Sequence, residues 1–262
     1  MHHGTQIAQG RDGLTWSGAL QVSPVLASVG PWAARLAELP AFPTVAALDA
    51  AMRDRLALEP AVSLEPQVKV KKRGAPRDRD TLYEVRIHVH RRIPTRERSW
   101  HDLLNVLVWA AFPHTKRALV ARQHAILEAI VPPGTTRLPG ARTREQDALA
   151  LLDEGGIVLM VPARDEAEVR RAHHEGDEDA LRRLRDAGCL APLVFGHALM
   201  EHVLEGGGLD ARGCGVVLVV DGIPASLEAR VEACDAALAR WVASSDELLA
   251  PSPWRGISLA IL

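Results

Sequence analysis

The sequence predicts a mixed α/β (α+β) fold: a helix-rich single domain with a small sheet. Apolar residues recur at helical spacing behind recognisable N-terminal caps, and a few short apolar runs have the length of buried strands. No internal repeat or clean linker divides the 262 residues. We expect a flexible N-terminal lead over residues 1–13 and one globular domain over residues 14–262.

Helices are predicted where a capping residue precedes apolar residues at helical spacing. Thr44, Ser99, Thr115 and Thr143 are such caps, and Thr143 with Gln146 has the pattern of a capping box. The predicted helices span residues 31–39, 45–56, 99–112, 116–130, 144–152, two helices within 164–187 separated at Gly176, 192–204 and 226–243. After Asn105 the helix over 99–112 is apolar all round, which predicts that it is buried.

Three strands are predicted. Residues 81–90 alternate between apolar and polar side chains, which is typical of a half-buried strand. His88 and His90 would share its polar face, where a solvated surface is a simpler interpretation than a pair of ligands. Residues 157–161 and 216–220 are short apolar runs typical of buried strands. A hairpin around residues 153–156 is an open alternative to the helix over 144–152.

Composition excludes several classes of protein. The net charge is −2, so neither nucleic acid nor an anionic membrane surface is an expected partner. No apolar run approaches the roughly 20 residues of a membrane helix, and no secretory signal is recognisable. Cys189, Cys214 and Cys234 are widely spaced and form no disulfide framework. We therefore expect a cytoplasmic protein with a small-molecule substrate, while the oligomeric state stays open.

Sequence motifs of common catalytic sites are absent. The chain has no GxxxxGK phosphate-binding loop, no GxSxG nucleophile elbow and no HExxH zinc motif. A catalytic site must therefore come from polar residues that are dispersed along the chain. The head of the buried helix over 99–112 is the first candidate, because its polar residues His101, Asp102 and Asn105 lie within the first turn and a half. Asp102 has an alternative role as a cap for this helix.

A second candidate group lies on the helix over 192–204. His197 and Glu201 are one turn apart, and His124 and Glu128 have the same spacing but fit a surface ion pair. We expect an enzyme, a hydrolase. The predicted catalytic residues are His101, Asp102, Asn105, Lys116, Asp147 and Asp153. A divalent metal is a candidate cofactor, with the predicted ligands His101, Asp102, His197 and Glu201.

The alternative is a non-catalytic binding or scaffold protein. In that case the same motifs are helix caps and core contacts, and the charged segment 164–187 or the loop 66–80 meets a partner. Geometry separates the two hypotheses. The enzyme requires the turns near residues 101, 147 and 197 to meet around one open hollow.

Several sequence blocks carry a family resemblance. They are residues 83–87, 94–96, 100–109 with Trp100-His101-Asp102, 112–116, 147–155 and 196–201. On these blocks the chain resembles a bacterial family of unknown function, domain of unknown function 3025, over about residues 24–256. His114 stands where that family typically has arginine. The resemblance implies a bacterial origin and a single domain, and it implies no activity.

Overall fold

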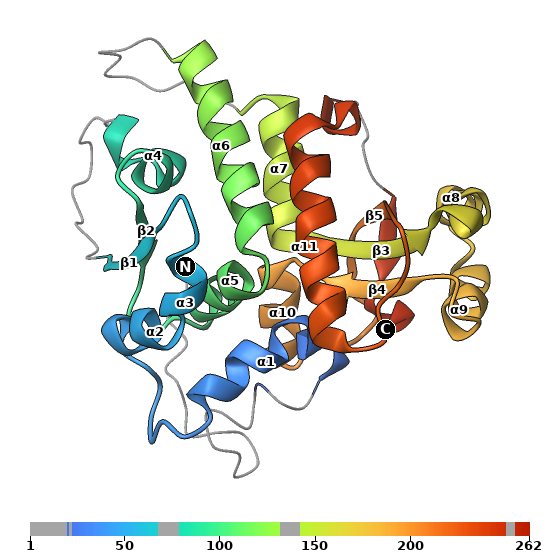
Figure 1. Cartoon of the computed structure of the whole chain (residues 1–262), viewed down its shortest axis with the longest axis horizontal. Helices are drawn as coiled ribbons and strands as arrows, with labels where there is room; N and C mark the ends of the chain where they lie inside the picture. Colours follow the sequence, from blue (N-terminus) through green and yellow to red (C-terminus); the bar gives the residue numbers. More distant parts are fainter. Residues whose placement is uncertain (1–19, 21–22, 68–78, 132–141, 250–254) are drawn as a thin grey trace.

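The computed structural model describes residues 20, 23–67, 79–131, 142–249 and 255–262. The predicted lead over residues 1–13 and most of the loop 66–80 lie outside the described residues. The predicted helix-rich α+β fold is confirmed: helices pack around two small sheets and share one apolar core (Figure 1). Within the described ranges, no helix combines the length and the apolar character that crossing a membrane requires.

The larger sheet has the strand order β4-β3-β5-β6. Its centre is the parallel pair β3 (Gly156–Pro162) and β5 (Arg212–Val220), which confirms the predicted strands at 157–161 and 216–220. β4 (Ala191–Val194) and β6 (Gly256–Ser258) run antiparallel to them at the two edges. Every residue of β3 is buried, as expected for a strand that is covered on both faces.

Helices connect and cover these strands. α7 (Arg144–Gly155) runs directly into β3, and α11 (Leu227–Ser244) follows β5. α8 (Glu166–Glu175) and α9 (Glu178–Asp186) pack at the far end of β3 (Figure 1). Gly176 separates them with a φ of 72°, a left-handed conformation that glycine adopts without strain. The two helices predicted within 164–187 are thus confirmed.

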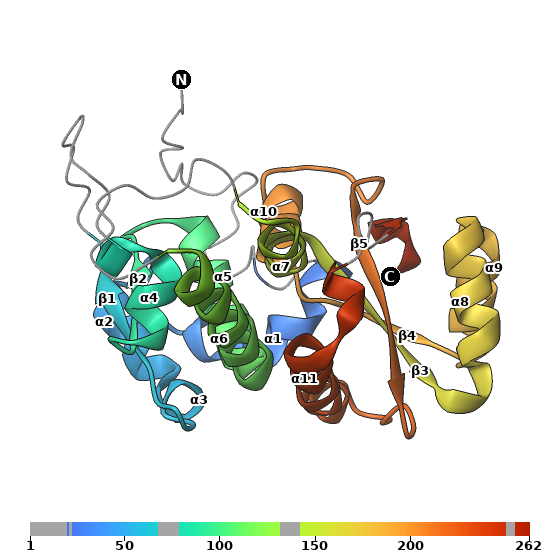
Figure 2. The ribbon, with the colours of Figure 1, turned by 90° about the horizontal axis from the view of Figure 1, so that it is seen from above.

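Figure 2 shows α5 and α6 beside α7 and α10. The remaining elements include the N-terminal part of the chain. These elements are η3 (Pro24–Val29), α1 (Gly30–Ala33), η4 (Ala34–Leu36), α2 (Val45–Ala51), α3 (Arg53–Leu56), β1 (Ser63–Pro66), η5 (Arg79–Thr81), α4 (Tyr83–His88), β2 (Arg92–Thr95), α5 (Trp100–Ala111), α6 (Pro113–Ile130) and α10 (His197–Leu204). β1 and β2 form the smaller, parallel sheet.

The predicted strand at 81–90 is wrong, because this segment contains the helix α4. α4 lies between α6 and β2 and buries residues on two opposite sides. Val85 packs with Leu127 and Val131, whereas Ile87 belongs to the main core. A short helix that is covered on two sides places apolar residues at every second position, so its pattern imitates that of a strand.

The predicted helix at 192–204 is correct only in its second half. Residues 191–194 form the edge strand β4, and α10 begins at His197. Pro192 lacks a backbone N–H, so it breaks a helix but is tolerated in an edge strand. Gly196 is required at the junction, since a Cβ there would come within 2.6 Å of the Glu154 carbonyl oxygen. The close approach brings the start of α10 against the end of α7.

The helices predicted over 31–39 and 45–56 are each divided: α1 passes into η4, which ends at Leu36, and Met52 separates α2 from α3. Two other helix ends also differ from the predictions. The hairpin alternative around 153–156 is wrong, because α7 continues to Gly155 behind the predicted capping box of Thr143 and Gln146. α6 begins at Pro113 rather than after Thr115. Its cap comes from α11: the buried carboxylate of Asp235 accepts hydrogen bonds from the backbone N–H groups of His114 and Thr115 and from Thr115 Oγ1. A cap from a distant helix has no local sequence signal.

We expect Asp235→Ala to lower the free energy of unfolding by roughly 2–4 kcal/mol, because it leaves buried donors of α6 without an acceptor. Chemical denaturation measures the loss. Ser226→Ala is the matched control, since Ser226 caps α11 at an exposed site and its loss should cost about 0.5–1 kcal/mol. Equal losses for both variants would contradict the role of Asp235 between the two helices.

Candidate functional site

A pocket of about 290 Å³ lies where α4, α5, α6 and α7 meet the start of α10. Most of its lining residues are polar, and they include residues from both helices that were predicted to carry the site, α5 and α10. The lining residues are Gln67, Tyr83, Glu84, Pro94, Arg96, His101, Asp102, Asn105, Lys116, Leu119, Val120, Gln123, Arg142, Ala150, Asp153, Glu154 and His197. The heads of α5 and α10 are therefore neighbours in space although almost 100 residues separate them in the sequence.

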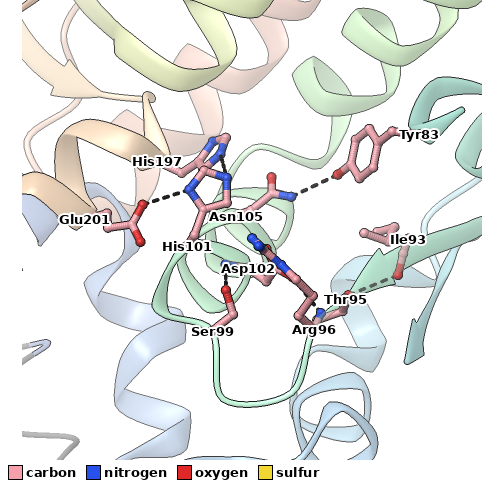
Figure 3. Close-up of polar contacts among 10 residues, drawn as sticks. All are labelled: Tyr83, Ile93, Thr95, Arg96, Ser99, His101, Asp102, Asn105, His197 and Glu201. Atoms are coloured by element: carbon pink, nitrogen blue, oxygen red, sulfur yellow. Dashed lines mark hydrogen bonds and ion pairs between the residues drawn. The ribbon is translucent and has the colours of Figure 1, made fainter. Parts of the chain in front are cut away.

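Two imidazoles from these heads face each other, as Figure 3 shows. Nε2 of His101 lies 3.1 Å from Nε2 of His197. The other ring nitrogen of each histidine is held by an oxygen. His101 Nδ1 is 2.8 Å from Glu201 Oε2, and His197 Nδ1 is 2.9 Å from the carbonyl oxygen of Asp153. The predicted pair of His197 and Glu201 thus contacts His101 at both ring nitrogens: Glu201 at Nδ1 and His197 at Nε2.

These contacts fix the positions of the protons. A carbonyl oxygen only accepts, so His197 Nδ1 carries a proton, and Nε2 of the neutral ring is an acceptor. The carboxylate of Glu201 likewise accepts from His101 Nδ1. Two nitrogen lone pairs would repel at 3.1 Å, so a proton lies between the two Nε2 atoms. His101 is then an imidazolium that donates one hydrogen bond to Glu201 and one to His197.

The surroundings of the two rings support this assignment. The hydrogen bond and the charge of Glu201 raise the pKa of His101 above its ordinary value, against the opposing effect of partial burial. Burial lowers the pKa of His197 to about 4. His101 is also the accessible member, with 31% of its side chain exposed, whereas His197 is 3% exposed. The pair therefore holds its proton on the ring that a ligand can reach.

A second polar network forms the floor of the pocket. The ammonium of Lys116, a residue only 1% exposed, donates to Asp153 Oδ1 at 2.5 Å and to Asn105 Oδ1 at 2.8 Å. The amide Nδ2 of Asn105 donates to the hydroxyl oxygen of Tyr83 at 2.9 Å. Burial is the largest single effect and would raise the pKa of Asp153, but the charge and the hydrogen bond of Lys116 and the two nearby histidines together outweigh it, so the pKa lies below its usual value. Asp153 is therefore a carboxylate.

Tyr83 contributes a hydroxyl group to this network, and its O–H has no acceptor among the described residues. Burial raises its pKa far above the ordinary value, so the phenol keeps its proton. Because its oxygen already accepts a hydrogen bond from Asn105, its O–H is directed elsewhere, and the residue lines the pocket. Tyr83 was missed as a site residue because the predicted strand gave no reason to place it next to Asn105.

Asp102 lines the pocket, but its carboxylate is paired with Arg96. The backbone N–H and the guanidinium of Arg96 donate to both of its carboxylate oxygens, at 2.6–2.9 Å. It therefore fastens the loop between β2 and α5, while the cap of α5 is the predicted Ser99, whose Oγ accepts from the backbone N–H of Asp102. Arg96 has no local motif that would have predicted this contact.

The structure brings most of the predicted site residues together, with one exception. Six of them line the pocket: His101, Asp102, Asn105, Lys116, Asp153 and His197. Glu201 is not part of the lining, but it contacts His101 at Nδ1. Asp147 is exposed near the start of α7 and is not part of the lining. The turn near residue 153 takes its place, at the other end of the same helix.

The predicted metal ligands do not converge as a ligand set. Across the described residues, no group of three or more His, Cys, Asp or Glu side chains is arranged to hold a metal ion. Asp102 is turned toward Arg96, and Glu201 contacts His101 Nδ1 rather than a point shared with His197. A metal at this site stays a prediction.

A larger hollow of about 370 Å³ lies beside β4, away from the histidines. Its polar side chains include Arg185 and Arg230, which donate to backbone carbonyl groups of Ile261, Pro224 and Ala225. No imidazole, thiol or carboxylate side chain appears in its described lining. Of these two hollows, the smaller pocket is therefore the one lined by titratable histidine and carboxylate side chains.

The two histidines should titrate differently in nuclear magnetic resonance spectra of ring-¹⁵N-labelled protein. We expect His101 to stay charged above pH 6.5, since its pKa is raised, and His197 to stay neutral down to about pH 4. The stability that His101 contributes is present at pH below 6.5 and is lost as the pH rises through its raised pKa. Glu201→Gln should return the pKa of His101 toward its ordinary value.

His174→Gln, at an exposed histidine on α8, is the control for this measurement, because it should leave both titrations unchanged. An unchanged pKa of His101 in Glu201→Gln would contradict the conclusion that the Glu201 carboxylate stabilises the imidazolium form of His101.

Comparison with known proteins gives a family but no activity. A family model described as "Protein of unknown function (DUF3025)" matches residues 69–259, which include α5, α6, α7 and α10. No curated protein and no solved structure matches the chain. The matched region covers well over half of the chain and contains most of the pocket lining. The chain belongs to the DUF3025 family of proteins of unknown function.

Proposed function

We propose that the pocket is a catalytic site at which a small polar molecule is hydrolysed by general acid–base chemistry. The observation that carries this proposal is the opposite tuning of two facing imidazoles. The pKa of His101 is raised beside Glu201, whereas burial lowers the pKa of His197 to about 4. Titratable neighbours whose environments push their pKa values apart are typical of catalytic acids and bases.

His101 is the proton donor in this proposal. Glu201 stabilises its imidazolium through Nδ1. His197 accepts the hydrogen bond from Nε2 without taking the proton, because charging a buried imidazole is unfavourable. A leaving-group oxygen or nitrogen that gains negative charge is a stronger acceptor than His197. It therefore receives the Nε2 proton as its bond to the substrate breaks.

Asp153 is the matching proton acceptor. Its Oδ1 binds Lys116, and no described residue donates a hydrogen bond to its Oδ2. A water molecule at this oxygen gives one proton to the carboxylate while its own oxygen attacks the electrophilic carbon of the substrate. Asp153 then returns the proton to His101 through solvent. Both groups are restored, and the atoms of one water molecule end in the two products.

The charges that line the pocket restrict the substrate. The positive side chains are Arg96, His101, Lys116 and Arg142, and the negative ones are Glu84, Asp102, Asp153 and Glu154. A polyanion such as a nucleotide would meet no surplus of positive charge, so a neutral or zwitterionic molecule fits better. The volume of about 290 Å³ suits a small molecule, whose polar atoms would bind the O–H of Tyr83 and the ammonium of Lys116.

The test compares leaving groups. From a panel of small neutral esters, amides and glycosides, we expect the protein to hydrolyse one class. His101→Gln should then lower kcat/KM for an alkyl leaving group by about 10²–10⁴-fold, the usual contribution of a general acid. With a 4-nitrophenolate leaving group of the same class, which departs without a proton, the loss should stay below roughly tenfold.

His174→Gln serves again as a control on an exposed histidine, and thermal unfolding of each variant shows whether it is folded. Equal losses for both leaving groups in folded His101→Gln would remove the proton-donor role. Hydrolysis of no member of the panel would favour the alternative of a non-catalytic binding or scaffold protein.

A divalent metal is the second candidate, and one observation favours it. Both Nδ1 atoms of the facing histidines are held by oxygen acceptors, as is usual for histidines that bind a metal through Nε2. A metal between the two Nε2 atoms would replace the shared proton. The acid–base proposal and the metal proposal exclude each other, because the two Nε2 atoms cannot share a proton and bind a metal ion at the same time.

Removal of metal separates the two candidates. We expect protein dialysed against EDTA and then against metal-free buffer to keep its hydrolytic activity and the raised pKa of His101. Elemental analysis of the untreated protein should find less than one metal ion per chain. A stoichiometric metal whose removal abolishes activity, and whose binding His197→Gln weakens, would replace the acid–base proposal by the metal site.

We also propose that the protein is cytoplasmic. Its three cysteines, Cys189, Cys214 and Cys234, are all free thiols. Proteins of a reducing compartment typically keep cysteines in this state.

A further inference from the structure

A pair of histidines outside the catalytic network joins α4 to α6. The rings of His88 on α4 and His124 on α6 stack with their centroids 4.2 Å apart and an angle of 21° between their planes. Neither histidine takes part in the contacts of His101 and His197. We call His88 and His124 the histidine latch.

The latch is an important part of a small interface. On its α6 side, α4 has only a minor apolar cluster of its own, formed by Val85, Leu127 and Val131. This cluster is separate from the main core, which α4 reaches through Ile87 on its opposite side. The attachment of α4 to α6 therefore depends strongly on how the two stacked rings interact.

The rings are built to stack as neutral imidazoles. His124 Nε2 is buried and has no hydrogen-bond partner among the described residues. Burial is the main cause that lowers the pKa of both His88 and His124 below 6.5. Stacking two neutral rings costs no electrostatic energy, whereas two imidazolium ions at this distance repel each other.

Charged groups on the neighbouring elements act on the rings in both directions. Arg79 on η5 and Arg91 after α4 disfavour a charge on the rings. Glu128 on α6 lies 3.5 Å from His124 Nε2 and would favour the charge, but it is already paired with Arg79. The other titratable or charged groups of η5, α4 and the segment up to β2 are Asp80, Tyr83, Glu84, Arg86, His90 and Arg92; Arg86 pairs with Glu65, and Arg92 donates to Ser63. Those of α6 are His114, Lys116, Arg117 and Arg122.

The position of α4 matters because it forms one wall of the pocket. Tyr83 and Glu84, at its start, line the pocket, and Tyr83 accepts the hydrogen bond of Asn105. When α4 moves away from α6, the Tyr83 hydroxyl leaves Asn105 and the pocket opens on this side. A change at the latch is thus transmitted over one and a half turns of helix.

We propose that the histidine latch is a pH-sensitive closure of the pocket: its neutral, stacked form holds α4 and Tyr83 in place, and its protonation in mild acid releases them. The latch itself does not depend on the proposed hydrolysis, and only its consequence for substrate access rests on that function. The direction of the pH effect follows from the linkage between proton binding and folding. A histidine whose pKa is lowered by folding stabilises the folded state above pH 6.5, and this contribution is lost as the pH falls.

The sequence offers a direct probe, because Tyr83 is the only tyrosine of the chain. Protein grown with ¹³C-tyrosine gives one set of ring signals, which report the position of α4 without any substrate. We expect these signals to shift or broaden between pH 7.5 and 5, with a midpoint below 6.5. Backbone amides of residues 83–88 should exchange at least tenfold faster at pH 5 than at pH 7.5, after correction for the intrinsic rate.

His124→Phe is the decisive variant. It keeps an aromatic ring in the stack and removes the titrating imidazole, whose buried Nε2 makes no hydrogen bond, so the protein should fold and the transition of the tyrosine signal should disappear. His88→Gln should lower the midpoint or remove the transition. His174→Gln and His101→Gln are controls: the first is exposed, and the second removes the nearest other titrating imidazole of the pocket.

A transition that persists unchanged in His124→Phe would overturn the latch, as would a tyrosine signal that does not respond to pH at all. A transition that vanishes in His101→Gln but not in His124→Phe would assign it to the catalytic pair instead. Because none of these readings uses turnover, absence of hydrolysis would count against the proposed function and leave the result for the latch intact.

Discussion

The buried ammonium of Lys116 is the constraint on which the site depends. A charge at 1% exposure is unfavourable unless it is paired and fully hydrogen-bonded. The partners come from two other helices, Asn105 from α5 and Asp153 from α7, and the ammonium also lies 5.5 Å from the centre of the Trp109 ring. The three helices must therefore meet with their polar positions in register, and the pocket forms above this contact.

Asp153 extends the constraint to the histidines. Its carboxylate binds Lys116, while its carbonyl oxygen holds Nδ1 of His197. One residue at the end of α7 thus joins the floor of the pocket to the pair of His101 and His197. The close passage of Gly196 over Glu154 and Gly155 makes this possible, because a side chain there would push α10, and His197 with it, away from α7. The protonation state of His101 is set by the same arrangement, since it relies on a neutral neighbour.

The sequence indicated much of this site because its signals are local. Ser99 and the polar head of α5 predicted a buried helix that opens on a hollow, and the one-turn spacing of His197 and Glu201 predicted a shared face. The predictions that were wrong concern features that depend on contacts between residues far apart in the sequence. α4 resembles a strand because α6 and β2 cover it from two sides, and the cap of α6 comes from Asp235 on α11. The pairing of Asp102 with Arg96 likewise depends on where β2 places the loop, and the catalytic roles stay predictions.

The two histidine pairs show how the same side chain acquires opposite properties. His101 has a carboxylate, Glu201, within hydrogen-bond distance, so it keeps its charge although it is partly buried. His124 also has a carboxylate nearby, but Glu128 is committed to Arg79, so burial prevails and the ring stays neutral. Whether a carboxylate is free therefore decides the state of each ring. Acid favours the charged form of His88 and His124, and alkali removes the charge of His101. If both proposals hold, the pocket is closed and His101 carries its proton only between these two pH limits.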